Sequence, residues 1–375
     1  MSSFDASPEH APMSGLDEFL IHNSPEPVRV MYTSDPRAYE RHWFTCQDKV
    51  GDLIMVMGIG FYPNLDTADA YALVNYKGQH THVRYHRRLG LNRMDMRMGP
   101  LNFEVVEPFK TWKLTLDENP YGIRYEIYWH YTKRPIFHEL GIGGGARGGI
   151  RATDSVGYEG FGVQEGWIEV DGQRFTLDTD KYLGSRDHHW GARGGVGGPI
   201  GAPPPGGGGG GIGGTHVGQW VEFSDWSIWL NSNLYPLGDE RAGAGAYTTT
   251  DRHLKFEPET GLFVEGTITN VTESGETKEL HYRRLGNQTA FLGCGGYLRT
   301  PDGGPTHGIY PGEDKLFGGT YDVNTIAGRK QLTALNDHHC EVTCDGETTY
   351  GILETVDPSA YETFKRGVPG YRLLE

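Results

Sequence analysis

The chain has 375 residues, 37% of them hydrophobic and 12% aromatic, which predicts packed cores in two domains rather than one. Its net charge of −15 argues against nucleic acid as a partner, because phosphates need a basic face. The first 27 residues lack the basic-then-apolar pattern of a secretion signal, and no run approaches the roughly 18 apolar residues that span a bilayer. Cysteines at 46, 294, 340 and 344 show no recognised zinc pattern and predict free thiols in a cytoplasmic protein.

Short apolar or alternating runs dominate the first half of the chain after a polar lead-in at 1–27. Strands are expected at 53–61, 70–76, 82–87, 101–106, 111–116 and 121–131. Lys77-Gly78 predicts a turn between two of them, and Asp171-Gly172 predicts a hairpin between 161–170 and 173–177.

The second half repeats this pattern. Two aromatic strands joined near Ser224-Asp225 are expected within 218–230, and further strands at 255–270, 279–285 and 331–335. Asp345-Gly346 predicts another hairpin. No long segment shows helical periodicity. Repeated short strands with frequent turns favour an all-β fold of two β-sandwich or β-barrel domains in tandem.

A low-complexity, glycine-rich tract occupies residues 194–214. It offers almost no side chains to bury, so it cannot form a packed element. It separates a first β domain at 28–193 from a second at 215–375. The tract is either a linker between the domains or a flap over the charged segment before it, and both interpretations stay open.

That charged segment, at 184–193, holds two arginines, an acid, two histidines and a tryptophan. Charged residues are seldom buried unless they are paired, so the segment predicts the wall of a site. Asp187 and His188 form the candidate acid–base pair, because an adjacent carboxylate can fix a histidine tautomer and raise its basicity. Arg186 is the candidate group that holds negative charge during the reaction.

Which histidine faces the site depends on local structure. If the segment is a strand, its neighbouring side chains point to opposite faces. Asp187 and His189 would then share one face, and the other would carry Arg186, His188 and Trp190.

Two other interpretations of the segment are a buried ion-pair network and a metal site. Arg186, Asp187 and Arg193 would form a buried ion-pair network that joins the domains, since buried charges are usually paired. A metal interpretation would use the Asp-His-His runs at 187–189 and 337–339, with His216, but no ligand spacing supports it, and we expect no metal.

Five segments carry a family resemblance: PVRV at 27–30, GFYPNL at 60–65, GPLNFEVVEP at 99–108, RDHHWGAR at 186–193 and YGILE at 350–354. With them, the sequence resembles the bacterial lipocalin-like proteins related to hydroxyneurosporene synthase (carotenoid 1,2-hydratase) and to the AttH-type proteins. The resemblance implies two lipocalin-like β domains with a pocket near their junction, and activity on large hydrophobic substrates without a redox cofactor. The chain departs from the family pattern at His189, where serine is usual, and in its glycine tract.

We therefore predict a cofactor-independent lyase, hydratase or isomerase that acts by acid–base catalysis on a hydrophobic terpenoid or aromatic, for example lignin-derived, alcohol or alkene. The alternative is a carrier that binds a hydrophobic small molecule without chemistry, and a homodimer is the candidate assembly. Aromatic and polar residues expected to contact the substrate are Tyr62, Asn64, Trp129, His189, Trp190, Arg193, His216 and Trp220.

Overall fold

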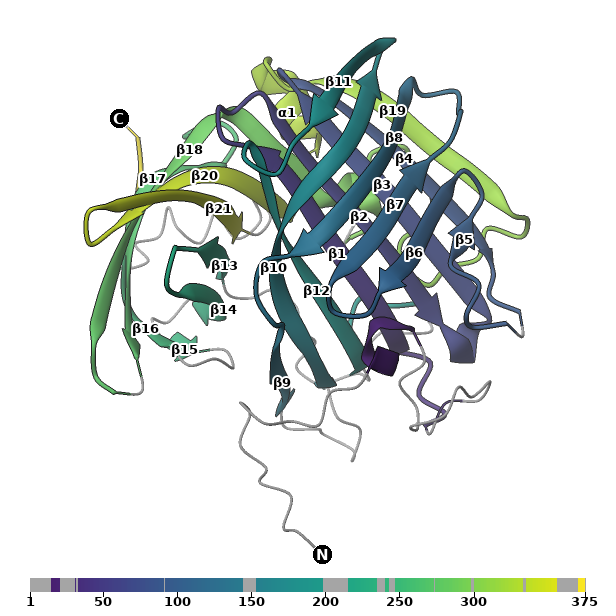
Figure 1. The fold of residues 1–375 in the computed structure, drawn as a ribbon, viewed down its shortest axis with the longest axis horizontal. Helices are drawn as coiled ribbons and strands as arrows, with labels where there is room; N and C mark the ends of the chain where they lie inside the picture. The colour runs from purple at the N-terminus through teal and green to yellow at the C-terminus, as the bar shows by residue number, and fades with distance from the viewer. Residues whose placement is uncertain are drawn as a thin grey trace, which may run out of the picture.

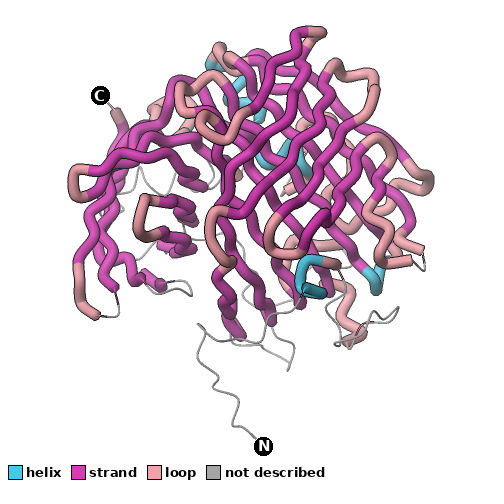
Figure 2. Tube along the Cα trace, in the orientation of Figure 1, coloured by secondary structure: helices cyan, strands magenta, loops and turns pink. Residues whose placement is uncertain are grey.

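The computed structural model describes residues 15–20, 31, 33–90, 92–143, 153–197, 215–234, 240–242, 247–272, 274–297, 300–332, 335–355 and 370–374. Within them the chain forms two curled, almost wholly antiparallel sheets (Figure 1). Strands dominate the trace in Figure 2. The described helices are short: η2 (Gly15–Glu18), η3 (Pro63–Leu65), η4 (Leu292–Gly295) and α1 (Ile326–Leu332). The all-β fold class predicted from the sequence is confirmed.

The first sheet has 13 strands, in the order β19-β4-β3-β2-β1-β12-β10-β8-β7-β6-β5, with β9 and β11 each paired to β10. Its strands are β1 (Ala38–Asp48), β2 (Leu53–Tyr62), β3 (Thr67–Tyr76), β4 (Gln79–Arg88), β5 (Arg97–Met98), β6 (Leu101–Glu107), β7 (Thr111–Leu116), β8 (Ile123–Tyr131), β9 (Ile136–Gly143), β10 (Thr153–Val170), β11 (Gln173–Leu177), β12 (Tyr182–Ala192) and β19 (Lys315–Asp322).

The second sheet has 9 strands, in the order β15-β14-β13-β21-β20-β18-β17-β16-β22. Only the pairing of β16 with β22 is parallel among those described. Its strands are β13 (Thr215–Glu222), β14 (Ser227–Leu234), β15 (Glu240–Ala242), β16 (Tyr247–Phe256), β17 (Phe263–Thr272), β18 (Thr277–Phe291), β20 (Asn336–Cys344), β21 (Glu347–Thr355) and β22 (Tyr371–Leu373).

The predicted two-residue turns are confirmed. Asp171 and Gly172 join β10 to β11 with φ of 48° and 77°, and Asp345 and Gly346 join β20 to β21 with φ of 51° and 84°. Positive φ at both central residues matches the right-handed twist of a hairpin, which explains why an Asp-Gly pair occupies these positions.

The strand expected at 331–335 is wrong, because its first two residues end helix α1. The hydroxyl of Thr325 accepts a hydrogen bond from the backbone N–H of Gly328 at 3.1 Å, as a helix N-cap does. This cap gives the short helix a local start that the apolar pattern of residues 331–335 does not reveal.

Strand β19 comes from the second half of the chain but pairs with β4 of the first sheet. The first sheet therefore contains a strand from each of the two domains that the sequence predicted at 28–193 and 215–375. Residues 198–214 of the glycine tract lie outside the described residues, so the linker and flap interpretations both remain predictions.

A hydrophobic cluster between the sheets positions the site. It joins Trp43 and Phe161 of the first sheet to Trp220, Phe291 and Ile352 of the second. The four cysteines are buried and form no disulfides. No helix in the described ranges has the length and apolar character needed to cross a membrane.

Candidate active site

Strand β12 carries the charged segment between its neighbours β1 and β10. Asp187 and His189 lie on the face that contacts residues packed against the second sheet, whereas Arg186 and His188 lie on the face that packs on the core of the first. This is the division of side chains that the strand hypothesis predicted.

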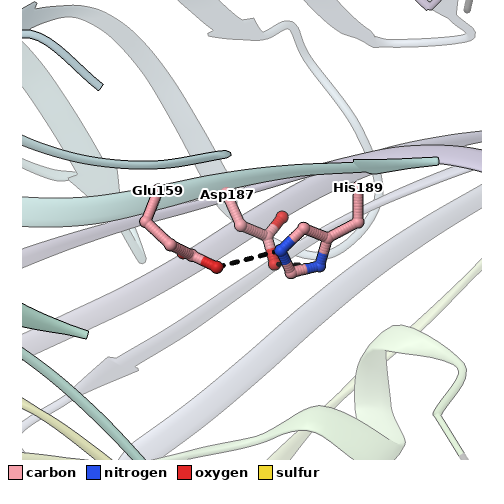
Figure 3. A group of neighbouring side chains, drawn as sticks. All are labelled: Glu159, Asp187 and His189. Atoms are coloured by element: carbon pink, nitrogen blue, oxygen red, sulfur yellow. Dashed lines mark hydrogen bonds and ion pairs between the residues drawn. The ribbon is translucent and has the colours of Figure 1, made fainter. Parts of the chain in front are cut away.

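Asp187, His189 and Glu159 form an array of paired charges on the face toward the second sheet (Figure 3). His189 Nδ1 lies 3.3 Å from Asp187 Oδ2, and His189 Nε2 lies 2.9 Å from Glu159 Oε1. Glu159 comes from β10, where it sits directly opposite Asp187. The side chains of Glu159 and His189 are 0% and 8% exposed, but that of Asp187 is 18% exposed, so Asp187 is the member that solvent reaches.

Gly157 makes room for the imidazole. It lies opposite His189 in the β10–β12 pair, and a Cβ built on it would be 2.2 Å from Cδ2 of the ring. Only glycine permits this close approach.

The electrostatics of the array favour the protonated form of both Asp187 and His189 relative to the free side chains. Burial and, to a smaller extent, the charge of Glu159 raise the pKa of Asp187 to about 6, although the charges of His189, Arg41 and Arg193 oppose the rise. Burial disfavours the charged form of His189, but the carboxylates of Asp187 and Glu159 outweigh burial and raise its pKa. The negative charge of Asp187 and the positive charge of His189 therefore stabilise one another.

Two tryptophans link the array to the second sheet. Trp220 of β13 donates its indole N–H to Glu159 Oε2 at 2.8 Å, and Trp43 of β1 donates to Asp337 Oδ2 of β20 at 3.2 Å. The two indole rings lie 5.3 Å apart. Burial and the nearby carboxyl of Glu354 hold the pKa of Asp337 well above its usual range. Aromatic rings and acids of the opposite sheet thus lie next to the array.

Arg41 lies beside His189 in the β1–β12 register. Its Nη2 is 3.0 Å from His307 Nε2, and its guanidinium stacks 4.5 Å from the ring centre of Tyr297. His307 Nδ1 is 3.0 Å from Asp69 Oδ1, which also accepts the hydroxyl of Tyr62 at 3.1 Å. Residues from β1, β2, β3 and the loop after η4 therefore meet on this face of the first sheet.

The opposite face of β12 holds a separate buried network. Arg186 Nη1 lies 2.6 Å from Glu18 Oε2, and both side chains are 0% exposed. His188 Nε2 lies 3.1 Å from Glu40 Oε1. The structure thus pairs the side chain of Asp187 with His189, and it places Arg186 and His188, which the sequence had suggested as its partners, among the residues of the first core.

Other residues expected to contact the substrate divide between the two faces. Tyr62 donates to Asp69 near Arg41, Trp220 donates to Glu159 of the array, and the charge of Arg193 reaches Asp187 and lowers its pKa. Trp190 packs on the opposite face, with its ring 5.0 Å from that of His188.

The remaining three lie away from the array or beyond description. Trp129 is a core residue whose indole N–H donates to the backbone carbonyl of Thr45 at 3.2 Å. Asn64 donates from its amide to the carbonyls of Thr33 and Asp35, at 2.7 and 2.8 Å, and so fastens a turn to the segment before β1. The side chain of His216 lies outside the described residues.

Glu159, Asp187 and His189 each offer one metal-ligand atom, and these atoms lie within 4.8 Å of one another. Both ring nitrogens of His189 already face carboxylates, which favours an imidazolium over a neutral ligand. The charges of Arg41 and Arg193 act on Asp187 and oppose a cation. The arrangement fits a proton-sharing array better than a metal centre, and metal independence stays a prediction.

Sequence reasoning missed several residues of this cluster, notably Glu159, Arg41, Asp69 and His307. Arg41 and Glu159 lie in strands that also carry several aromatic residues, and charges within such strands were the available signal. Nothing local marks His307, which a loop brings onto the first sheet.

Two curled sheets with a buried acid–base array between them define the class of protein: an all-β protein with a titratable site at the contact of its sheets. The chain belongs to a family of unknown function (DUF8625), whose model matches residues 13–208. No curated protein matches the chain.

Several solved structures are similar. CghA with Sch210972 has a TM-score of 0.43 and 9% identity, covering 86% of this chain and 89% of that one. CghA alone has a TM-score of 0.44 and 9% identity, covering 86% and 88%. Kievitone hydratase from Nectria haematococca has a TM-score of 0.39 and 12% identity, covering 90% and 98%.

Proposed function

We propose that this protein is a cofactor-independent enzyme that moves protons on a hydrophobic small molecule, as a lyase, hydratase or isomerase. The observation that carries the proposal is the pairing of Asp187, a partly exposed carboxyl with a pKa of about 6, with His189, whose pKa is raised. Groups that titrate close to the working pH are effective general acids and bases, and strongly perturbed groups cluster at functional sites.

The array assigns different roles to its members. Asp187 is the base, because it is the most exposed of the three and becomes ionised above about pH 6. His189 is the acid, because the two carboxylates beside it hold its proton. Glu159, fully buried and bonded to Trp220, orients the imidazole. His189 therefore takes the role that the sequence had suggested for His188.

These roles describe the elimination of water or its reverse. Asp187 accepts a proton from a carbon atom, the electrons of that C–H bond form a carbon–carbon double bond, and the neighbouring hydroxyl leaves as water with the proton of His189. Addition of water to an alkene follows the same steps backwards. The indoles of Trp43 and Trp220 and the resemblance to the carotenoid hydratase family support a terpenoid or aromatic alcohol or alkene as substrate.

The test is deuterium exchange in D2O with a panel of terpenoid and aromatic alcohols and alkenes, followed by mass spectrometry. An enzyme of this kind introduces deuterium at carbon or changes the mass of one compound by one water. Asp187→Asn and His189→Gln should lose this activity, whereas the matched variant His188→Gln on the opposite face should keep it once its fold is confirmed. Bound compounds recovered unchanged and without deuterium would identify a carrier, and loss confined to His188→Gln would move the site into the first core.

A further inference from the structure

Arg41 is a buried arginine at the centre of a polar cluster that also holds Tyr62, Asp69, Tyr297 and His307. It is only 4% exposed, and its Cγ lies where a Cβ on Gly60 would come within 2.9 Å. A guanidinium carries five N–H donors, and a buried one normally pairs them because unpaired buried donors are costly.

A short relay holds one end of this guanidinium. Burial and the nearby charge of Arg41 lower the pKa of His307 to about 3, so His307 is neutral. Its Nδ1–H donates to Asp69, which leaves Nε2 free to accept from Arg41 Nη2 at 3.0 Å. Asp69 is fixed in turn by the backbone N–H of Gly308, at 2.8 Å, and by the hydroxyl of Tyr62. The relay therefore uses Nη2 alone to position Arg41.

The other donors of Arg41 are uncommitted. Neither Nε nor Nη1 has a hydrogen-bond partner among the described residues. The hydroxyls of Tyr71 and Tyr297, 3.4 Å apart, belong to the same cluster, and both residues interact electrostatically with the guanidinium. Arg41 lies directly opposite His189 in the pairing of β1 with β12, and its charge also lowers the pKa of Asp187, so these donors lie beside the acid–base pair.

We propose that Arg41 binds a substrate oxygen that is negatively charged, or becomes so, while Asp187 and His189 move the proton. The oxygen belongs either to a carboxylate or to a carbonyl that turns into an enolate. This inference rests on the proposed function and narrows its substrates to hydrophobic molecules with such a group. Charge-assisted hydrogen bonds of a buried guanidinium are strong enough to select for an anion.

In the enolate case Arg41 stabilises the charge that the base creates. Asp187 takes the proton from the carbon next to the carbonyl, and the electrons of that C–H bond move onto the carbonyl oxygen beside Arg41. The enolate then re-forms the carbonyl, the carbon–carbon double bond forms, and the β-hydroxyl departs as water with the proton of His189. Donors aimed at developing charge contribute about 10²–10³-fold to such steps.

The first experiment measures binding without turnover. Calorimetric titration should show the wild-type protein binding 2-naphthoate about tenfold or more tightly than its neutral analogue 2-naphthamide. Arg41→Gln should lose this preference. The matched variant Arg97→Gln, which removes the same charge from an exposed position, should keep it. Equal wild-type binding of the two probes would exclude a carboxylate ligand, and an undiminished preference in Arg41→Gln would show that another group binds it.

The second experiment tests the enolate case through exchange of the α-hydrogens of 1-tetralone in D2O. Exchange should fall about 10²-fold in Arg41→Gln and stay unchanged in Arg97→Gln. A naphthoate preference without exchange identifies a carboxylate substrate, and exchange without a naphthoate preference identifies a carbonyl substrate. If neither result is obtained, the proposal is overturned.

The two experiments also separate this proposal from the proposed function. The naphthoate preference is measurable even if Asp187 and His189 catalyse nothing. If Arg41→Gln does not fold, a crystal structure of the wild-type protein with 2-naphthoate decides the matter. A carboxylate within hydrogen-bond distance of Arg41 Nε or Nη1 supports the proposal, and a carboxylate elsewhere overturns it.

Discussion

Replacing Asp187 with asparagine should abolish turnover and yet make the protein more stable at alkaline pH. Burial raises the pKa of this carboxyl from 3.8 to about 6, which means that the folded protein holds its charged form unfavourably. Since one pKa unit corresponds to about 1.36 kcal/mol, the charge costs at most roughly 3 kcal/mol. Asparagine has nearly the same shape without the charge but gives up the ion pair with His189, so we expect a gain of about 1–3 kcal/mol.

The sign of this effect fixes its pH dependence. A pKa raised by folding means that the stability contributed by Asp187 is fully present below its ordinary pKa of 3.8 and is lost as the pH rises through about 6. Urea unfolding of the two proteins should therefore give nearly equal free energies at about pH 4 and the full difference at about pH 8. Turnover should fall by about 10²–10⁴-fold, the usual contribution of general acid–base catalysis.

Asp69→Asn is the matched control. Asp69 is more deeply buried, but His307, His86 and Arg41 outweigh burial and hold its pKa well below the ordinary range. Its stability contribution is therefore present above its ordinary pKa and lost as the pH falls through the lowered one, so the variant should lose about 3–5 kcal/mol at about pH 8. A comparable loss in Asp187→Asn would refute the catalytic assignment and make Asp187 a structural ion-pair partner.

The remaining predictions concern other parts of the same framework. Glu18→Gln should cost about 3–5 kcal/mol in urea unfolding, because it leaves the buried guanidinium of Arg186 without its carboxylate; an unchanged midpoint would contradict this. Gly157→Ala should lower both the melting temperature and turnover, since its methyl group collides with His189, and full activity would show that the ring is not needed in this position. A pH–rate profile should rise through about 6 as Asp187 ionises and fall above the raised pKa of His189. Chelation should change neither stability nor turnover; about one bound zinc or iron per chain, with activity lost on its removal, would contradict metal independence.

Local patterns account for what the sequence predicted about the fold. Alternating runs and Asp-Gly pairs act over a few residues, so strands and hairpins such as the one at Asp171-Gly172 are visible without tertiary information. The pairing of β19 with β4 depends on packing between distant segments, and no local pattern signals it. Helix α1 has only seven residues and begins at the cap formed by Thr325. A helix this short has too weak a sequence pattern to outweigh the strand-like residues at its end.

The candidate site follows the same division. The charged segment that contains Asp187 is contiguous, so the sequence identified it as the wall of a site. Strand alternation predicted that Asp187 shares a face with His189, because it places the adjacent His188 on the opposite face. Glu159 and Arg41 enter through the registers of β10 and β1 with β12, which set which side chains lie opposite one another and which no single segment encodes.

The most direct test of proton exchange by Asp187 and His189 is an NMR titration of the Asp187 carboxyl carbon and the His189 ring nitrogens. Their signals are assigned by their loss in Asp187→Asn and His189→Gln. We expect Asp187 to titrate near pH 6 and His189 to hold its proton above its ordinary pKa of 6.5. A carboxyl that titrates at or below its ordinary value of 3.8, together with a His189 that is neutral at pH 6.5, would contradict the claim that this pair exchanges a proton with substrate.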